Sequence, residues 1–166
     1  MEIKFSQEEC NDIITYAKTL PMTESRSLYN AITRKYAFRV LLYNYNSKWI
    51  FDKVYKKLYQ DTGVEVKKTV EEFYIHNYVE GDYFVKHKDV PTKIWNVGVC
   101  LNDNYEGGEF VLHNPTLVLP KEAGSIYCFE SQREHEVLPI TKGERWSIIG
   151  FLERGHIGVN KPTQLL

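Results

Sequence analysis

Residues 78–89 read Tyr-Val-Glu-Gly-Asp-Tyr-Phe-Val-Lys-His-Lys-Asp and end in the tripeptide His87-Lys88-Asp89. In an extended strand, side chains two positions apart point to the same face, so His87 and Asp89 can direct an imidazole nitrogen and a carboxylate oxygen at one point. One further histidine would complete the set of two histidines and one carboxylate that leaves coordination positions open on Fe(II). A His-x-Asp also arises by chance in a chain with five histidines, so the tripeptide alone does not establish a site.

The pattern of apolar residues around this stretch predicts helices first and strands afterwards. Ser6 and Glu9 form a capping box at the start of a helix that we expect over about residues 6–19. A second helical stripe begins at Ser47 and stops at Gly63. After that the apolar period becomes two, and the expected strands cover these runs: 64–79, 82–89, 94–101, 109–113, 116–119, 125–130, 135–140 and 144–153.

This segregation of helices and strands excludes a parallel sheet built from βαβ units. It predicts a mainly β (α+β) fold, a double-stranded β-helix or jelly roll, with the N-terminal helices packed on one side. Residues 21–46 are expected to form a loop and then a strand, and residues 155–166 a tail that crosses the surface. At 166 residues, we expect one domain over residues 1–166.

Composition limits the partners and the compartment. A net charge of −1 with 26% charged residues gives no broad electrostatic footprint for nucleic acid or for a membrane surface. The cysteines are three in number, without a CxxC spacing, and predict neither a disulfide framework nor a zinc ribbon. Because the N-terminus lacks the pattern of a signal peptide and no window approaches 18 apolar residues, we expect a soluble, cytoplasmic protein.

A third metal ligand must come from the remaining histidines: His76, His113, His135 and His156. His135 differs in context, because it opens a strand and is followed ten residues later by Arg145. Arg145 and Ser147 begin an otherwise apolar strand, and a buried guanidinium without a partner would cost several kcal/mol. That partner is either a structural Asp or Glu of the chain or the carboxylate of a ligand, since arginine binds carboxylates in a two-pronged fashion. At this point both alternatives, and His113 as the third ligand, stay open.

Taken in chain order, the motifs are Tyr78-x-x-Gly81, His87-x-Asp89, Gly107-Gly108-Glu109-Phe110, Gly124-Ser125, His135-Glu136-Val137 and Gly143-Glu144-Arg145-Trp146-Ser147. In this order, over about residues 73–153, the chain resembles the Fe(II)- and 2-oxoglutarate-dependent dioxygenases, specifically their prolyl 4-hydroxylase-like branch.

The resemblance implies the roles of the site residues. Iron would be bound by three side chains: His87, Asp89 and His135. Arg145 would hold the far carboxylate of 2-oxoglutarate, Ser147 would assist it, and Tyr78 would donate a hydrogen bond to the same cosubstrate. The implied cofactors are Fe(2+), 2-oxoglutarate and O2, with ascorbate as a reductant. Gly107-Gly108 would form the turn after the strand 94–101, either as a plain hairpin turn or as part of a loop that contacts substrate.

The resemblance also implies a substrate class. The expected reaction hydroxylates a residue of a peptide or protein, with proline as the expected residue, and releases succinate and CO2. Nucleic-acid demethylases of the superfamily carry a second arginine where Phe151 stands here, and collagen-type prolyl hydroxylases carry lysine at the position of Arg145. This chain differs from the first group at Phe151 and from the second group at Arg145.

Candidate docking surfaces are the loop 102–108 and the tyrosines Tyr29, Tyr36, Tyr43 and Tyr45. The alternatives are a jelly-roll binding module without turnover, a hydroxylase of a small free molecule, and a cupin-like enzyme that uses another metal without 2-oxoglutarate.

Overall fold

The computed structural model describes residues 1–24, 38–41, 47–67 and 73–159. Its helices are α1 (Gln7–Ala17) and α2 (Lys48–Thr62), with a short 3-10 helix, η2 (Arg154–His156). The strands are β1 (Thr23–Glu24), β2 (Phe38–Leu41), β3 (Val64–Val66), β4 (Phe73–Tyr78), β5 (Phe84–His87), β6 (Lys93–Cys100), β7 (Glu106–Gly107), β8 (Phe110–Leu112), β9 (Leu117–Val118), β10 (Ile126–Glu130), β11 (His135–Val137), β12 (Ile140–Lys142), β13 (Arg145–Glu153) and β14 (Ile157–Val159).

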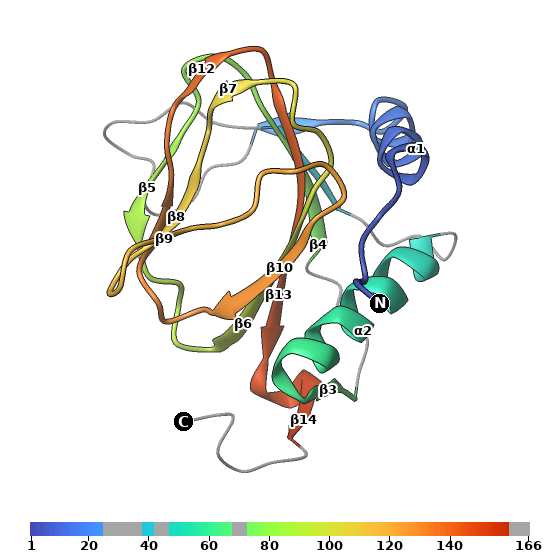
Figure 1. Cartoon of the computed structure of the whole chain (residues 1–166), viewed down its shortest axis with the longest axis vertical. Coiled ribbons are helices and arrows are strands. Elements are labelled where there is room, and N and C mark those ends of the chain that lie inside the picture. The colour runs from blue at the N-terminus through green and yellow to red at the C-terminus, as the bar shows by residue number, and fades with distance from the viewer. Residues whose placement is uncertain (25–37, 42–46, 68–72, 160–166) are drawn as a thin grey trace.

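Two antiparallel sheets face each other and enclose the interior of a jelly roll (Figure 1). The larger sheet has the strand order β1-β2-β4-β13-β6-β10, and the smaller has the order β5-β11-β8-β9. Two further strand pairs, β12-β7 and β14-β3, lie at the ends. The expected mainly β jelly roll is therefore confirmed.

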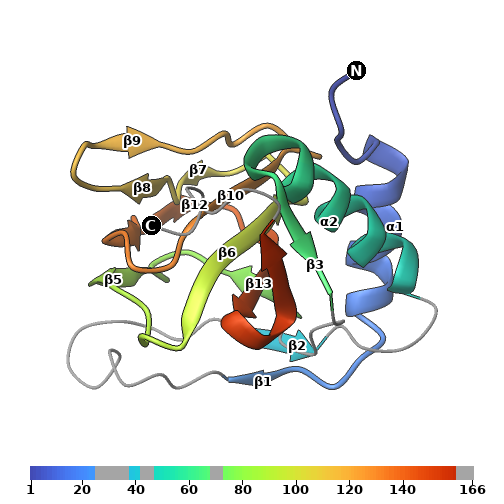
Figure 2. The same cartoon turned by 90° about the horizontal axis from the view of Figure 1, so that it is seen from below.

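Both helices cover the outer face of the larger sheet, as the view from below shows (Figure 2). The side chains that fill this layer include Cys10, Ile13 and Ala17 of α1 and Ile50, Phe51, Val54 and Leu58 of α2. They pack against Ile75, Val97, Val99, Ile148 and Leu152 of the sheet. The packing of helices on one side, expected from the sequence, is found.

Local sequence explains where the helices begin and end. At the start of α1 the Ser6 hydroxyl accepts a hydrogen bond from the Glu9 N–H at 3.1 Å, and the Glu9 carboxylate accepts one from the Ser6 N–H at 2.7 Å. This reciprocal capping box satisfies two N–H groups that would otherwise lack a partner. α2 ends at Gly63, whose φ of 73° is the left-handed conformation that glycine adopts without strain.

Several strand predictions are wrong in their pairing or extent. The run 64–79 is not one strand, because β3 leaves the main sheet and pairs with β14. Part of the expected C-terminal tail is therefore a strand, while residues 160–166 lie outside the described residues. The run 135–140 divides at Pro139 into β11 and β12, since proline has no N–H to donate to a sheet ladder.

The glycine turn also differs from the expectation. Gly107 ends β7, which pairs with β12, and it does not directly follow the strand expected over 94–101. A loop over residues 101–105 comes between them.

The strand expected in the segment 21–46 is found as β2, whereas the sequence pattern does not predict β1. The candidate docking tyrosines of that segment, Tyr29, Tyr36, Tyr43 and Tyr45, lie outside the described residues.

All three cysteines are free thiols. Burial raises the pKa of Cys10 to about 11, and burial together with the Asp61 carboxylate raises the pKa of Cys128 to about 12. These thiols therefore stay protonated at neutral pH. Within the described ranges, neither helix is both long enough and apolar enough to cross a membrane.

Candidate active site

The register of the larger sheet determines which side chains face the interior between the two sheets. Residues paired across antiparallel strands share a face. On β13 the interior face carries Arg145, Ser147, Ile149 and Phe151, as the sequence predicts, while Trp146, Ile148 and Leu152 join the outer layer. The neighbours of this face are Tyr78, His76 and Tyr74 on β4, Cys100, Gly98 and Asn96 on β6, and Tyr127 and Phe129 on β10.

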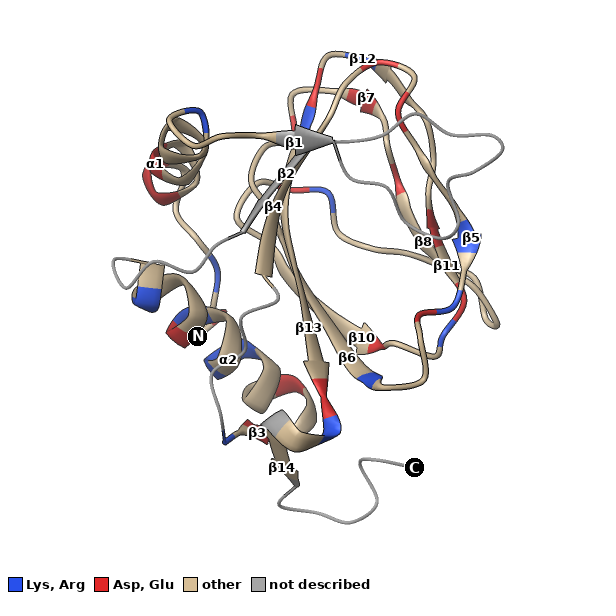
Figure 3. Ribbon diagram, turned by 180° about the vertical axis from the view of Figure 1, so that it is seen from behind, with Lys and Arg blue, Asp and Glu red and all other residues tan. Residues whose placement is uncertain are grey.

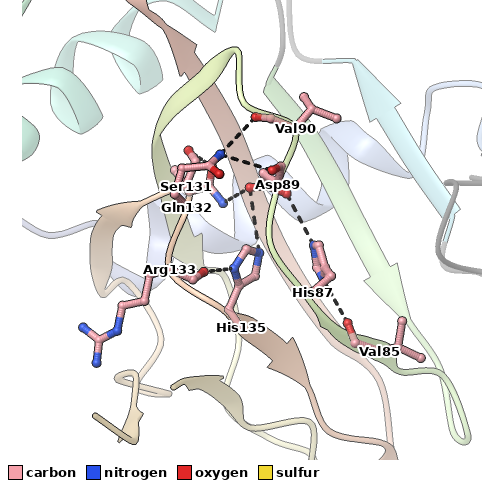
Figure 4. A network of polar contacts seen from close by, with 9 residues as sticks. Val85, His87, Asp89, Val90, Ser131, Gln132, Arg133 and His135 are labelled. Carbon is pink, nitrogen blue, oxygen red and sulfur yellow. Dashed lines mark hydrogen bonds and ion pairs between the residues drawn. The ribbon is translucent and has the colours of Figure 1, made fainter. Parts of the chain in front are cut away.

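Two histidines of the smaller sheet and an aspartate next to it converge on this interior. His87 ends β5 and pairs in register with His135 of β11, and Asp89 follows in the chain after β5 (Figure 4). One ligand atom from each of the three residues lies within 4.8 Å of the others. His87 Nε2 is 3.4 Å from Asp89 Oδ1, and His135 Nε2 is 3.8 Å from Asp89 Oδ2. The geometry thus brings together the three residues that the resemblance assigns to iron.

Both histidines are held in one tautomer by the backbone. His87 Nδ1 lies 2.8 Å from the carbonyl oxygen of Val85, and His135 Nδ1 lies 2.7 Å from that of Arg133. Because a carbonyl oxygen only accepts hydrogen bonds, each Nδ1 carries the proton and donates. Each Nε2 then presents its lone pair toward the cluster, which is the orientation that a metal ligand requires.

A chain of hydrogen bonds orients the Asp89 carboxylate. The Asn96 side-chain N–H₂ donates to Asp89 Oδ2 at 2.6 Å, and the Ser131 hydroxyl donates to the Asn96 side-chain oxygen at 2.7 Å. The Asp89 N–H in turn donates to the Ser131 carbonyl oxygen at 3.2 Å. Asn96 and Ser131 are buried, so this support is fixed by packing. No sequence motif indicated either residue.

The electrostatic surroundings favour the charged form of Asp89 and the neutral form of His135. Burial alone raises the pKa of Asp89, but polar contacts with the side chains of His87 and Asn96 lower it. The nearby charge of Lys93 lowers it further, and the net shift of the Asp89 pKa is downward. Burial lowers the pKa of His135. At neutral pH the site therefore offers a carboxylate and a neutral imidazole, the forms that bind metal.

Arg145 is a buried cation at the start of β13. It is 3% exposed, and its Nη1 donates to the Ser147 hydroxyl at 2.9 Å. Burial lowers the pKa of the guanidinium, but the surrounding side chains of Tyr127, Tyr105 and Cys100 outweigh this effect and raise the pKa. Among the described residues, no Asp or Glu forms an ion pair with Arg145. A structural carboxylate partner, one of the two alternatives left open by the sequence, is absent from this part of the chain.

Two tyrosines that the sequence did not single out border Arg145. Tyr105 precedes β7 and Tyr127 lies on β10, and both are close enough to the Arg145 guanidinium for its charge to lower their pKa against the effect of burial. Tyr127 fits because its neighbour on β6 is Gly98, where a Cβ would stand 2.2 Å from the Tyr127 ring. A glycine within the apolar strand 94–101 was the available signal that a large group approaches the backbone there. Tyr78, which the resemblance selects, presents its ring at 5.8 Å from the Arg145 guanidinium carbon.

The other histidines lie elsewhere. His113 follows β8, and its Nε2 is 3.0 Å from the Glu136 carboxylate. His76 stacks on Tyr78, with ring centroids 5.8 Å apart. His156 is in η2. In the described part of the chain, the one group of three side chains that could hold a metal is His87, Asp89 and His135.

Comparison with known proteins gives these residues a context. Residues 73–153 match the family model described as the 2OG-Fe(II) oxygenase superfamily. A curated relative, the PKHD-type hydroxylase IL0759 of Idiomarina loihiensis, is 30% identical over 95 residues, covering 52% of this chain and 44% of the relative. The chain thus spans less than half the length of that relative.

Solved structures share the fold. A 2OG-Fe(II) oxygenase family oxidoreductase from Burkholderia pseudomallei superimposes with a TM-score of 0.74 at 21% identity, covering 94% of this chain and 83% of that one. A prolyl-4-hydroxylase from Pseudomonas putida gives 0.70 at 16% identity, with 93% and 90% covered. A prolyl hydroxylase from Trichoplax adhaerens, solved with a peptide fragment of the hypoxia inducible factor oxygen degradation domain, gives 0.70 at 15% identity, with 87% and 76% covered. Residues 73–153 of this chain are therefore similar in sequence to the 2OG-Fe(II) oxygenase superfamily, and the fold is that of its solved members.

Proposed function

We propose that this chain is an Fe(II)- and 2-oxoglutarate-dependent hydroxylase. The overall reaction converts a C–H bond of the substrate, 2-oxoglutarate and O2 into the hydroxylated product, succinate and CO2, so that one oxygen atom enters each organic product. The observation that carries the proposal is a charged, buried Arg145 without a described carboxylate partner, facing the same interior as His87, Asp89 and His135.

Fe(II) fits the first of these sites. Two neutral imidazoles and one carboxylate are the donor set that non-haem Fe(II) oxygenases use, and their Nε2 and carboxylate atoms converge here. The bound iron, together with 2-oxoglutarate and O2, supplies the oxidising chemistry. The chain contributes the fixed orientation of the ligands through Val85, Arg133 and Asn96 and the exclusion of water by burial.

2-Oxoglutarate fits the second site. Its far carboxylate would accept hydrogen bonds from the Arg145 guanidinium in a two-pronged arrangement. The hydroxyl groups of Ser147, Tyr105 and Tyr127 lie against the same guanidinium and can donate to that carboxylate. We propose Tyr127 and Tyr105 as cosubstrate-binding residues beside Arg145 and Ser147, and we keep Tyr78, through its ring, as part of the pocket wall.

The proposed substrate is a residue, with proline as the first candidate, in a peptide or protein. Support comes from the likeness of the fold to prolyl hydroxylases, one of which was solved with a peptide. Because the carboxylate of Asp89 is present at the metal site, hydroxylation is favoured over halogenation, which needs that position vacant for a halide. A small free molecule remains the second candidate substrate.

Succinate formation tests the proposal directly. Purified protein is incubated with Fe(II), ascorbate, 2-oxoglutarate and a pool of proline-containing peptides, beside the His87→Ala variant. We expect succinate and a peptide mass increase of one oxygen atom with the wild type, and at least a hundredfold less of both with His87→Ala, because a metal ligand is lost. If the wild type binds 2-oxoglutarate yet forms no succinate with any peptide or small-molecule pool, the binding-module alternative is correct.

The hydrogen bond from Asn96 to Asp89 gives a milder prediction. We expect Asn96→Ala to weaken Fe(II) or Mn(II) binding by about 10- to 100-fold, because outer partners of metal ligands typically have this effect. The measurement is a metal titration with a competing chelator. Asn11→Ala, on the exposed side of α1, is the matched control and should bind metal as the wild type does. Equal affinities for the two variants would show that Asp89 does not need this support.

A further inference from the structure

Two aromatic residues on the interior face lie outside the metal site and the Arg145 pocket. Phe151 is near the end of β13 and Tyr74 is near the start of β4, and both are only partly buried. Their ring centroids are 6.5 Å apart, with the ring planes inclined by 60°. At the opposite end of this face, Arg145 pairs with Tyr78. The two rings therefore line the end of the interior that is farthest along the strands from the Arg145 pocket.

The register connects these rings to the metal site. Phe151 pairs with Asn96 of β6, and Asn96 donates the hydrogen bond to the Asp89 carboxylate. Lys93, three residues before Asn96, holds its ammonium 3.4 Å from the centroid of the Phe151 ring. Lys93 is also close enough for its charge to act on Asp89. Phe151 and Lys93 are thus linked to Asp89, Phe151 through its strand neighbour Asn96 and Lys93 through its charge.

The segment that joins β5 to β6 carries more lysines than acidic residues. Residues 86–93 contain the lysines Lys86, Lys88 and Lys93 and a single acidic residue, Asp89. Asp89 is turned toward the metal site, whereas the side chains of Lys86 and Lys88 are exposed on either side of His87. Lys86 is 3.8 Å from Glu134 at the surface, a distance at which an exposed pair contributes little. Figure 3 shows this basic colouring on β5 and at the start of β6.

We propose that Tyr74 and Phe151 form the subsite that receives the side chain to be hydroxylated, and that Lys93 selects a peptide with an acidic residue next to that side chain. This inference rests on the proposed function, whose substrate class it narrows. Aromatic faces pack well against the pyrrolidine ring of proline, as in the aromatic grooves that bind proline-rich segments. When the peptide binds, its carboxylate can form an ion pair with the Lys93 ammonium, and this ion pair replaces the cation–π contact between Lys93 and the Phe151 ring.

The test uses two peptides that differ at one position, proline flanked by Glu and proline flanked by Gln, with this protein chain, Fe(II), 2-oxoglutarate and ascorbate in air. We expect the wild type to hydroxylate the Glu peptide with a KM at least tenfold lower than that of the Gln peptide at low salt, and the preference to shrink as salt is added. Lys93→Gln should reduce the preference to less than threefold. Lys48→Gln, an exposed lysine of α2, is the matched control and should retain it.

Phe151 is tested in parallel. Phe151→Ala should raise the KM for both peptides at least tenfold, while Phe151→Tyr restores it to within threefold of the wild type. Binding of 2-oxoglutarate, followed by calorimetry, separates this effect from damage to the Arg145 pocket and should change less than threefold in Phe151→Ala. Tyr59→Ala, on the exposed face of α2, is the aromatic control.

The outcomes distinguish the two levels of the proposal. Equal KM values for the Glu and Gln peptides, or a preference that survives in Lys93→Gln, would overturn the selection by charge. An unchanged peptide KM in Phe151→Ala would overturn the aromatic subsite. Succinate formed only with small molecules would overturn the peptide class, although the hydroxylase would stand. No succinate with any substrate would overturn the proposed function itself.

Discussion

Arg145→Met is expected to weaken 2-oxoglutarate binding at least a hundredfold and, at the same time, to leave the cosubstrate-free protein as stable as the wild type or more stable. The loss of affinity corresponds to about 2.7 kcal/mol, within the range for removing one partner of a buried charge pair. We expect no loss of stability because the guanidinium is buried without a described carboxylate partner, so that its removal leaves no buried acid unpaired. Replacing a buried charge by an apolar side chain of similar length is often neutral or stabilising.

Calorimetry with 2-oxoglutarate, with Mn(II) in place of Fe(II) and without oxygen, measures the first effect, and thermal unfolding measures the second. A gain of about 1 kcal/mol would raise the Tm by about 2–4 °C for a chain of this size. Arg154→Met, at an exposed arginine of η2, is the matched control and should change neither quantity. Retained affinity together with a lower Tm would mean that Arg145 is a structural residue, paired outside the described residues. Activity that persists in Arg145→Met without added 2-oxoglutarate would favour a cupin-like enzyme that does not use this cosubstrate.

His135→Ala is expected to abolish stoichiometric metal binding, whereas His113→Ala keeps it. His135 lies in the cluster with His87 and Asp89, and its Nε2 faces the Asp89 carboxylate at 3.8 Å. His113 instead pairs with Glu136 at 3.0 Å. Losing one of three protein ligands should weaken Fe(II) or Co(II) binding by at least a hundredfold, and catalysis should fall with it.

The measurement is metal content per chain after loading and desalting, supported by the absorption of bound Co(II). Circular dichroism and thermal unfolding verify that both variants are folded. His113→Ala serves as the control for removing a partly buried imidazole near the same sheet. One bound metal ion in His135→Ala and none in His113→Ala would exchange the roles of the two residues, the alternative that the sequence left open.

The sequence determined those features that depend on short segments. The capping box of Ser6 and Glu9 and the end of α2 at Gly63 act within one helical turn, so that residue identity is enough to place them. The two faces of β13 likewise follow from the period-two alternation of a strand. The proximity of His87 and Asp89 also belongs to this class of features, because side chains two residues apart on an extended segment lie close together in any fold.

The tertiary structure decided which distant segments meet. Tyr127 reaches Arg145 because β10, β6 and β13 are adjacent and Gly98 leaves room between them, and Asn96 reaches Asp89 across the two sheets. The pairing of β3 with β14 and of β7 with β12 also joins segments far apart in the chain. Strand neighbours and register are set by the packing of the whole sheet and not by any local pattern. For that reason the sequence named the residues expected to carry the chemistry, whereas only the fold revealed the residues that hold them in place and the aromatic end of the interior beside them.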